Sequence, residues 1–371
     1  MKVLLVTPFY TNGVVGPAKF SVILKSALPE QVDILTENSD DTNVISVDIK
    51  LNFFRRKLTQ YFNRIIYHKK IHQLLKSNHE YTHLVFINGI LGYGFDSKTY
   101  PGIKVIHMIN HEQYAILKPY LGFKYLAQLF YVWMEKHTIR NAQHLIVNSE
   151  YLKNKIIRDF DIDPSRIFIL RKSIVTSRYA FKPERTTDKK SVKILFLKSD
   201  WKRGGLEDIA GAFKLLSEIH FTITIAGPGK EHEKTITQLF VKLTNVKLNY
   251  LGKQNEGEVI QLLEEHDLLC IPSRSEALGV AIMEGLASGI PVVTTNVGGI
   301  GEVTKNGEYA WVTQPENPES LAETIRQCLN NPTLRKEKSF AGIHFIKKEF
   351  DYSVMIKNCL EYLNNDQKYH L

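Results

Sequence analysis

Two glutamates separated by seven residues, Glu276 and Glu284, form the most informative pair of chemical groups in the chain. Glu276 lies in a polar turn after a short apolar run, and Glu284 lies inside a helix predicted over residues 279–288. The neighbours of Glu284 in that helix are apolar, and a carboxylate buried there without a partner is costly. Glu284 is therefore expected to accept hydrogen bonds, and the two hydroxyl groups of a ribose suit it.

The turn between the two glutamates also predicts an anion site. The N–H groups of Ala277, Leu278 and Gly279 lie at the start of the predicted helix, where no helical carbonyl accepts from them. Such N–H groups, together with the helix dipole, bind a phosphate group or a sugar hydroxyl. The segment 276–284 is therefore the first candidate for a functional site.

The elements that would position this segment alternate between short apolar strands and helices. In the front half the predicted strands are 3–6, 32–36, 84–87, 105–109, 145–147 and 167–170. In the rear half they are 192–197, 221–226, 246–251, 268–271 and 291–295. The predicted helices include 56–76, 122–140 and 150–159 in the front half and 206–219, 231–243, 256–266, 318–330 and 334–348 in the rear half. This alternation indicates an α/β fold with two doubly wound, Rossmann-like parallel sheets, which bind ligands beyond the carboxyl ends of their strands.

A chain of 371 residues is expected to form two domains. The polar stretch 182–190 is the best candidate linker, so the expected domains are 1–182 and 190–350, with a C-terminal helix within 352–371 that packs back on the first. The proportions of hydrophobic residues (43%) and charged residues (23%) exclude a disordered chain, and no apolar run is long enough to span a membrane. The opening apolar run is too short for a signal-peptide core, and three separated cysteines predict neither a disulfide framework nor a zinc site. We therefore expect a cytoplasmic protein.

Positive charge is concentrated in the front half. Residues 1–185 carry 26 Lys and Arg against 15 Asp and Glu, and residues 186–371 carry 22 against 24, so the net charges are +11 and −2. This asymmetry predicts an anionic partner for the front half.

A basic and aromatic segment of the front half is one candidate for contact with that partner. No acidic residue occurs from 49 to 79, and Arg55, Arg56 and Lys57 lie among aromatic side chains there. A helix with an apolar face and a basic rim suits an anionic membrane surface, whereas a core-packed helix with a solvated basic edge explains the pattern equally well. A second aromatic segment, 120–133, either flanks that surface or packs in the core.

The stretch 271–293 resembles the glutamate–seven–glutamate signature of the retaining family-four glycosyltransferases, which have the GT-B fold. Further motifs that resemble the same family follow in order: Gly227-Pro228-Gly229, the run 246–252, Asn296-Val297-Gly298-Gly299 and Asn306-Gly307. In the front half, Asn148-Ser149-Glu150 and the opening strand with its glycine-containing loop are similar as well. The resemblance therefore covers essentially the whole chain.

The resemblance implies roles for residues of the rear half. Glu284 matches the glutamate that holds the ribose of a nucleotide-sugar donor, and Glu276 matches the catalytic-site glutamate near the hydroxyls of the donor sugar. Four backbone N–H groups would contact the sugar and the phosphates: those of Ala277, Leu278, Gly279 and Val280. The family places an arginine and then a lysine about five residues later to neutralise the diphosphate. This chain instead has Lys198, followed by Lys202 and Arg203, so either of the last two is a candidate for the second cation.

The resemblance also implies roles in the front half. Gly13 and Gly16 resemble the loop that lets the backbone approach the diphosphate. His111 matches the histidine beside the donor sugar, although a structural role explains it nearly as well, and His107 is an alternative inside a predicted strand. The usual Asn-Gly after the last front-domain strand is replaced by Arg171-Lys172-Ser173, a departure that concerns the hinge or the base pocket.

The expected activity is that of a retaining hexosyltransferase-type enzyme. It would move a sugar from a nucleotide-diphosphate sugar to a lipid-linked or polysaccharide acceptor in cell-envelope glycan synthesis, in the cytoplasm or on the inner face of the cell membrane. No cofactor or metal is expected, because helix N–H groups and the basic cluster would stabilise the leaving diphosphate. The Asp-x-Asp pattern at 159–161 follows a predicted helix rather than a strand end, so we interpret it as structural.

Three alternatives of other classes remain. A nicotinamide-dependent dehydrogenase would need a G-x-G-x-x-G opening with a downstream ribose acid, which neither half has. A nucleic-acid binder would explain the high isoelectric point but no binding module is recognisable, so no nucleic-acid partner is expected. A catalytically silent GT-B partner protein is the strongest alternative, because the basic pair and the Asn-Gly motif both depart from the family pattern.

Overall fold

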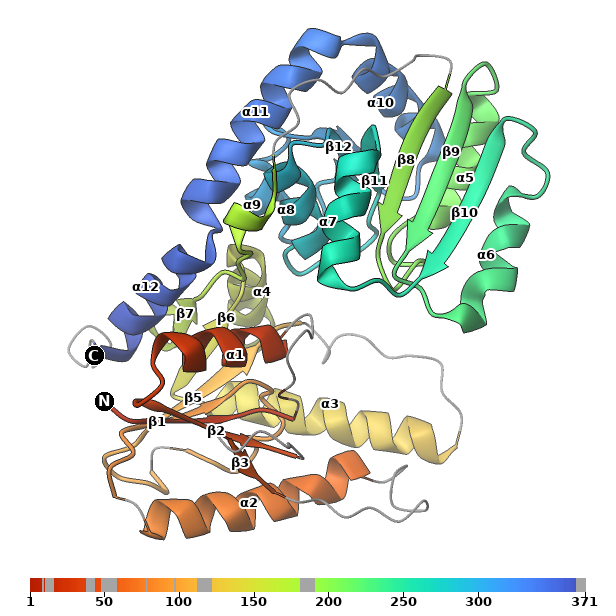
Figure 1. The fold of residues 1–371 in the computed structure, drawn as a ribbon. Coiled ribbons are helices and arrows are strands. Elements are labelled where there is room, and N and C mark those ends of the chain that lie inside the picture. The colour runs from red at the N-terminus through yellow and green to blue at the C-terminus, as the bar shows by residue number, and fades with distance from the viewer. Residues whose placement is uncertain are drawn as a thin grey trace. The chain divides into compact units, whose positions relative to one another are not determined.

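The computed structural model describes residues 1–8, 10, 17–37, 44–47, 59–77, 79–96, 98–111, 122–180 and 191–364. The chain divides into two compact units, Met1–Leu170 with Ile356–Leu371, and Arg171–Met355. Each unit is a parallel β-sheet with helices packed against it (Figure 1). The predicted α/β class with two doubly wound sheets is therefore confirmed.

The boundary between the units precedes the predicted linker. Ile174 forms an isolated parallel bridge with Asp351, and its N–H donates to the carbonyl of Phe350 at 3.0 Å. Asp351 also accepts from the N–H of Thr176 at 3.1 Å. These bonds attach residues 171–180 to the second unit, so the division falls after Leu170 rather than at 182. Residues 181–190, which include the predicted linker, lie outside the described residues.

In the described part of the first unit, seven parallel strands are ordered β3-β2-β1-β4-β5-β6-β7. They are β1 (Val3–Val6), β2 (Val32–Thr36), β3 (Ile45–Ser46), β4 (His83–Phe86), β5 (Lys104–Ile109), β6 (His144–Val147) and β7 (Ile167–Ile169). The helices are α1 (Pro17–Ala27), α2 (Thr59–Ser77), α3 (Phe123–Asn141) and α4 (Glu150–Phe160). Six of these strands lie within one residue of their predicted bounds because strands buried on both faces are continuous apolar runs. Strand β3 was missed, since two residues carry no periodic signal.

Helix α2 packs one stripe against the first sheet. Tyr67, Ile71 and Leu75, spaced four residues apart, are buried among residues of β1, β2, β4 and β5. The hydroxyl of Tyr67 donates to the carbonyl of Thr7 at 3.0 Å. This stripe of the helix therefore packs in the core, whereas Ile65 and Ile66 of the same helix are exposed. The predicted membrane-surface residues Arg55, Arg56 and Lys57 lie outside the described residues, as do Gly13 and Gly16.

The last helix, α12 (Tyr352–Asn364), begins in the second unit and ends in the first. Near its end, the ring of Tyr362 stacks on Phe168 with centroids 4.2 Å apart. The ammonium of Lys104 lies 4.5 Å from the centroid of the same ring. The C-terminal helix thus supplies part of the packing of the first unit.

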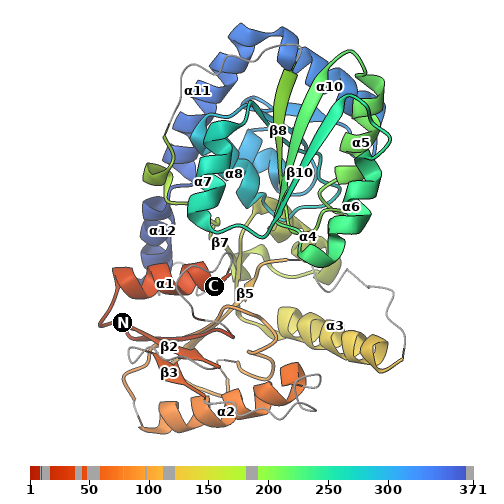
Figure 2. The same cartoon turned by 45° about the vertical axis from the view of Figure 1, so that its right-hand side comes forward.

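In the second unit, six described parallel strands are ordered β10-β9-β8-β11-β12-β13. They are β8 (Ser191–Leu197), β9 (His220–Ala226), β10 (Val246–Gly252), β11 (Leu268–Ile271), β12 (Val292–Thr295) and β13 (Trp311–Thr313). The helices are α5 (Leu206–Leu215), α6 (Glu233–Phe240), α7 (Glu256–Glu265), α8 (Val280–Ser288), α9 (Ile300–Thr304), α10 (Pro318–Asn330) and α11 (Pro332–Glu349). Figures 1 and 2 show α5 and α6 on one face of this sheet and α7 and α8 on the other.

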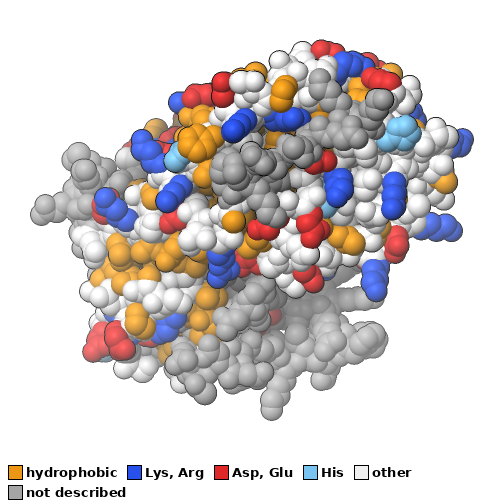
Figure 3. Space-filling model, turned by 45° about the horizontal axis from the view of Figure 1, so that its top comes forward, with side chains coloured by type: hydrophobic (Ala, Val, Ile, Leu, Met, Phe, Trp, Pro, Cys, Tyr) orange, Lys and Arg blue, Asp and Glu red, His pale blue; other side chains and the backbone are white. Residues whose placement is uncertain are grey.

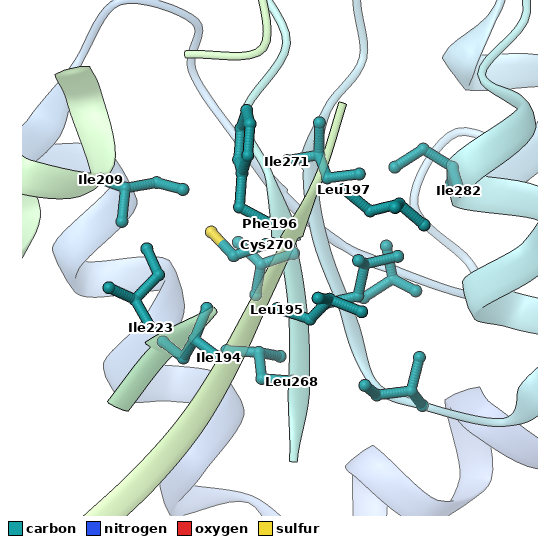
Figure 4. Packing of buried hydrophobic residues seen from close by; sticks show 14 of the residues in the cluster. Ile194, Leu195, Phe196, Leu197, Ile209, Ile223, Leu268, Cys270, Ile271 and Ile282 are labelled. Carbon is teal, nitrogen blue, oxygen red and sulfur yellow. The ribbon is translucent and has the colours of Figure 1, made fainter. Parts of the chain in front are cut away.

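The core of the second unit lies on both faces of its two central strands. Successive side chains of β8 alternate in direction, so Phe196 points toward Ile209 of α5 and Leu197 points toward Ile282 of α8 (Figure 4). Each of these residues is fully or almost fully buried. This two-sided packing fixes where β8 and β11 end, and therefore where the loops that follow them begin.

The surface carries no single-sign field on the face drawn in Figure 3, where basic and acidic side chains are interspersed. Among the helices that the structure describes, none has the length and hydrophobicity of a membrane span.

Candidate active site

The strand order of the second sheet defines where a ligand would bind. The chain leaves β8 toward β9 and β10 on one side, and returns to β11, β12 and β13 on the other. The crevice beyond the carboxyl ends of β8 and β11 is the switch point at which doubly wound sheets bind ligands. Lys198 directly follows β8, and Glu276 lies in the loop that follows β11. The two residues selected from the sequence therefore meet at this switch point.

Lys198 and Glu276 form a short, largely buried ion pair. The Lys198 Nζ lies 2.5 Å from Glu276 Oε2 and also donates to Ser273 Oγ at 3.1 Å. Only 12% and 18% of the two side chains is exposed. A charge-assisted bond of this length fixes both groups relative to the ends of the two strands.

Glu276 is held in its ionised form. Burial alone would raise the pKa of Glu276, but Lys198, Arg203 and the N–H of Ala277 together lower that pKa below its ordinary value. The Ala277 N–H donates to Glu276 Oε1 at 3.1 Å. Glu276 is therefore an acceptor of hydrogen bonds at neutral pH rather than an acid.

The structure separates the two candidates for the second cation. Arg203 is close enough to Glu276 to lower the pKa of its carboxyl group, and the Arg203 carbonyl accepts from the N–H of Arg274 at 2.8 Å. The Arg203 Nε is buried without a hydrogen-bond partner among the described residues, and it lies 3.7 Å from Asp200 Oδ2. Lys202 is exposed instead, with its Nζ 5.3 Å from the ring centroid of Trp201. The geometry thus favours Arg203 over Lys202.

An ion-pair fork that the sequence did not reveal holds the loop after β11. Arg274 donates from Nη2 to Asp208 Oδ1 at 2.9 Å and from Nε to Asp208 Oδ2 at 3.3 Å. Asp208 lies in the first turn of α5 and is buried. Its hydrogen bond raises the pKa of Arg274, so the guanidinium stays charged. No local pattern could indicate this pair, because 66 residues separate its members.

Two glycines allow the loops around the switch point to approach one another. Gly205 has a φ of +75°, and a Cβ there would collide with the carbonyl of Pro272. A Cβ on Gly298 would collide with the carbonyl of Glu276, to which the neighbouring Gly299 N–H donates at 3.2 Å. The two glycines therefore determine how closely the neighbouring loops enclose Glu276.

Helix α8 begins one residue later than predicted, and this changes which N–H groups face a ligand. Gly279 is left-handed with a φ of +97°, so it caps the helix instead of continuing it. The Ala277 N–H, predicted to be a donor to the ligand, already serves Glu276. The amides of Ile282 and Met283 donate to the carbonyl of Gly279, so in this helix the first open amide is that of Val280. The donor-binding role of Ala277 stays a prediction, and Leu278 and Gly279 precede the helix as part of its capping turn.

Glu284 lies on α8 and contacts the segment that follows the first unit. The hydroxyl of Tyr179 donates to Glu284 Oε1 at 3.3 Å. Burial, followed by the charges of Glu284 and Glu256, raises the pKa of Tyr179, so its hydroxyl remains a donor. Tyr179 is thus a positioning residue for Glu284 that the sequence pattern did not indicate.

The same segment brings a third cation to the site. Burial lowers the pKa of Lys172, and the charge of Glu276 opposes part of this shift. Within the described residues, the Lys172 ammonium has no hydrogen bond and no ion pair. Its neighbour Arg171 lies 3.6 Å from Glu302 of α9, so residues 171–179 run from α9 to Glu284. The sequence sign of this third cation was the basic pair Arg171-Lys172, which replaces the Asn-Gly of the family pattern.

The first unit contains the two histidines that the sequence singled out. His111 is half-buried and lies two residues after the end of β5. His107 is buried within β5, where its Nε2 is 3.2 Å from the carbonyl of Phe95 and its ring stacks on Phe86. Burial lowers the pKa of His107 to about 4. Of the two, His107 is a core residue and His111 is the one at the ligand-binding edge of its sheet.

A groove of the second unit lies apart from these groups. Its volume is about 520 Å³, and it opens between β8, β9, β10 and the end of α7. Thr224 and His266 are among its lining residues, with His266 Nε2 2.7 Å from Thr224 Oγ1. Neither Glu276 nor Glu284 lines this groove.

Known proteins are similar to this chain in the sequence of its rear half and in their fold. Residues 177–343 match the family described as glycosyl transferases group 1. Glycogen synthase of Mycobacterium tuberculosis is 25% identical over 60% of this chain and 54% of its own length, so the chain spans about half of that relative. WaaG, a glycosyltransferase involved in lipopolysaccharide biosynthesis, has a TM-score of 0.70 and 18% identity over 98% of this chain and 100% of its own. Anabaena Alr3699/HepE, solved in complex with UDP-glucose, has a TM-score of 0.68 and 16% identity over 98% and 99%.

These similarities agree with the switch-point site. The family match covers the loops that carry Lys198, Glu276 and Glu284, and the structural matches cover both sheets. The rear half is therefore similar to the glycosyl transferases group 1 family, and the chain as a whole has the fold of solved GT-B glycosyltransferases.

Proposed function

We propose that this protein is a retaining hexosyltransferase. It moves a sugar from a nucleotide-diphosphate sugar to a lipid-linked or polysaccharide acceptor in cell-envelope glycan synthesis. The UDP-glucose bound by the Anabaena protein supports the donor class, and the role of WaaG in lipopolysaccharide biosynthesis supports the acceptor class.

The observation that carries this proposal is the excess of cations around Glu276. Lys198 is paired with Glu276, and Arg203 has a buried Nε that makes no hydrogen bond and lies 3.7 Å from Asp200 Oδ2. Lys172 forms no ion pair among the described residues. A buried cation without an ion pair, as at Lys172, is costly unless a ligand compensates its charge. A diphosphate leaving group has the charge and the acceptor oxygens to do so.

Each group then has a separate part in donor binding. Arg203 binds a phosphate through its planar fork, and the first N–H groups of α8 donate to the same anion. Glu284 accepts from the ribose hydroxyls and Tyr179 orients it. Glu276 accepts from hydroxyls of the donor sugar, and His111 of the first unit contacts the sugar from its own sheet edge.

The reaction needs no enzyme nucleophile in this proposal. The bond between the anomeric carbon and the diphosphate oxygen breaks, and the electron pair leaves with the diphosphate. The acceptor oxygen attacks from the same face, and its proton passes to the departing phosphate oxygen. Because the cations and the helix N–H groups lower the energy of the leaving anion, neither a metal nor a cofactor takes part.

The proposed class of acceptor is supported by the net charge of the front half. The front half carries +11, which suits an acceptor with phosphate groups or one embedded in an anionic membrane. The enzyme would then work in the cytoplasm, on the inner face of the cell membrane, where the charges of Arg55, Arg56 and Lys57 would favour binding to the lipid headgroups.

A donor panel tests the proposal. The protein is incubated with sugar nucleotides of uridine, guanosine and adenosine, and release of the nucleoside diphosphate is followed with and without membrane lipid extract. We expect release from one donor class, and NMR of the product should show the anomeric configuration of the donor. An inverted product would contradict the retaining mechanism.

A catalytically silent partner protein is the second candidate, because the basic pair and the Asn-Gly motif depart from the family pattern. This candidate predicts that the protein binds nucleotides but releases no nucleoside diphosphate from any sugar nucleotide. Release of the nucleoside diphosphate that is lost in Arg203→Met and retained in Lys202→Met would exclude this candidate.

A further inference from the structure

The outer side of α3 in the first unit is apolar where a solvent-facing helix is normally polar. Leu126, Leu129, Phe130 and Trp133 are spaced i, i+3, i+4 and i+7, so they form one stripe, and Tyr125 adjoins it. Leu126 is 63% exposed, Phe130 47% and Trp133 51%. Isolated exposed apolar residues are common, whereas a contiguous stripe indicates a binding surface.

The same helix buries a different stripe, so core packing does not explain the exposed one. Val132 and Ile139 pack with Leu145 and Val147 of β6. The ring of Trp133 instead stacks on Phe130, with centroids 5.7 Å apart. The sequence alternative in which the aromatic segment 120–133 packs in the core is therefore wrong for these side chains.

Helix α2 continues this surface. Val105 packs with α2 and Ile109 packs with α3, and residues four apart in a strand share a face, so both helices cover the same face of the first sheet. The turn between β4 and β5 touches both helices, since Tyr93 contacts Trp133 and Gly94 lies beside His68. We call the outer sides of these two helices the α2–α3 face.

The α2–α3 face is positive as well as apolar. On α2, the exposed Ile65 and Ile66 precede the exposed Lys69 and Lys76. Neither helix carries an exposed carboxylate, because α2 has no acidic residue and Glu135 of α3 is buried.

We propose that the α2–α3 face inserts into the interfacial region of an anionic lipid bilayer. Apolar side chains beside lysine and arginine, without carboxylates, match a surface whose headgroups are negative and whose interior is hydrocarbon. Trp133 and Tyr125 have the amphipathic rings that favour the boundary between the two. The inference deepens the membrane location given in the proposed function, on which it rests, and it does not depend on the donor chemistry.

Trp133 itself provides the test. The chain has three tryptophans, and the other two, Trp201 and Trp311, are buried in the second unit. Vesicles of phosphatidylcholine with about a third phosphatidylglycerol are added to the wild-type protein. We expect the tryptophan emission to move to shorter wavelength and to be quenched by brominated acyl chains, and Trp133→Phe to lose both changes.

Two sets of variants identify the parts of the surface in a vesicle-sedimentation assay. Leu126→Asp with Phe130→Asp should weaken partitioning at least about tenfold. Changing Lys69 and Lys76 to Gln should weaken partitioning about fivefold for each residue, an effect that added salt reproduces. Phe340→Asp is the matched apolar control, because Phe340 of α11 is 53% exposed, and changing Lys347 and Lys348 to Gln is the matched charge control.

The alternative occupants give distinct results. If the face covers a second copy of this chain, ultracentrifugation will show a dimer that Phe130→Asp dissociates, and vesicles will leave Trp133 unquenched. Absence of quenching in the wild-type protein, with or without a dimer, overturns the proposal. Because nucleotide binding in solution involves the other unit, such a failure leaves the proposed donor chemistry intact.

Discussion

The switch point of the second unit and the α2–α3 face of the first unit use positive charge in opposite ways. At the switch point, carboxylates hold the cations in fixed positions, as Glu276 holds Lys198 and Asp208 holds Arg274. On the α2–α3 face, no exposed carboxylate restrains the lysines. Fixed cations select a small anion of defined geometry, whereas unrestrained cations beside apolar side chains suit an extended anionic surface.

Glu276→Gln tests the switch point, where cations are paired with carboxylates, and it has the largest expected effect. The amide keeps the shape of the side chain and removes the charge that holds Lys198 and accepts from the sugar. We expect turnover to fall about 100-fold or more, as for the loss of one preorganised electrostatic group. Initial rates with the active donor provide the measurement.

Glu319→Gln is the matched control for this variant, since Glu319 is exposed on α10. Its rate should equal that of the wild-type protein. Turnover by Glu276→Gln within about threefold of the wild type would contradict the role assigned to the carboxylate.

Lys172→Met removes a cation that forms no ion pair within the described residues. We expect affinity for a nucleoside diphosphate to fall about tenfold and affinity for the nucleoside to stay unchanged, because only the phosphates contact the ammonium. Calorimetric titration of both ligands measures the two effects. Lys202→Met, in which an exposed lysine is changed, should have a smaller effect on both.

The lowered pKa of Lys172 adds a pH dependence. Below that pKa the ammonium is charged, and the contribution of Lys172 to diphosphate affinity is constant. As the pH rises through it, the ammonium loses its proton and affinity falls, earlier than for an ordinary lysine. Lys172→Arg should retain affinity to higher pH, and an unchanged profile in Lys172→Arg would show that Lys172 does not bind the diphosphate.

Asp208→Asn releases the guanidinium of Arg274 from its fork. We expect the free energy of unfolding to fall by about 1–3 kcal/mol, since a buried carboxylate that accepts two charge-assisted bonds is lost. Diphosphate affinity should fall about fivefold because the loop after β11 is held less firmly. Denaturant titration and calorimetry separate the two effects, and Glu207→Gln, an exposed neighbour that also contacts Arg274, should change both less.

Tyr179→Phe gives the smallest expected effect and the sharpest readout. Without the hydroxyl, Glu284 is oriented less well, so binding of the ribonucleotide should weaken about threefold. Binding of the 2′-deoxy nucleotide should change less, because it lacks one of the hydroxyls that Glu284 accepts from. Equal losses for both ligands would indicate a merely structural role, and Tyr352→Phe on an exposed position of α12 is the control.

Sequence patterns predicted the strands far better than the site's surroundings. Strands β1, β2 and β11 have the predicted bounds because their apolar runs are buried on both faces. Strand β13 and helix α9, of three and five residues, are too short to show a period and were missed. The start of α8 was misplaced by one residue because Gly279 permits a helical as well as a left-handed backbone.

The residues of the candidate site also divide into those that the sequence could predict and those that it could not. Glu276, Glu284 and Lys198 could be selected because the loops that carry them resemble a known family. The environments of Lys172 and Tyr179 could not, since they depend on the bonds of Ile174 and Thr176 to residues about 175 positions away. Long-range packing of this kind leaves no local signal in a single sequence.

The central claim is that a diphosphate binds where β8 and β11 end, and calorimetry tests it most directly. UDP, GDP and ADP are titrated against the corresponding monophosphates in the wild-type protein and in Arg203→Met. We predict that at least one diphosphate binds more tightly than its monophosphate, and that Arg203→Met removes at least about tenfold of that affinity. No binding of any diphosphate, or equal binding by both proteins, would contradict the claim.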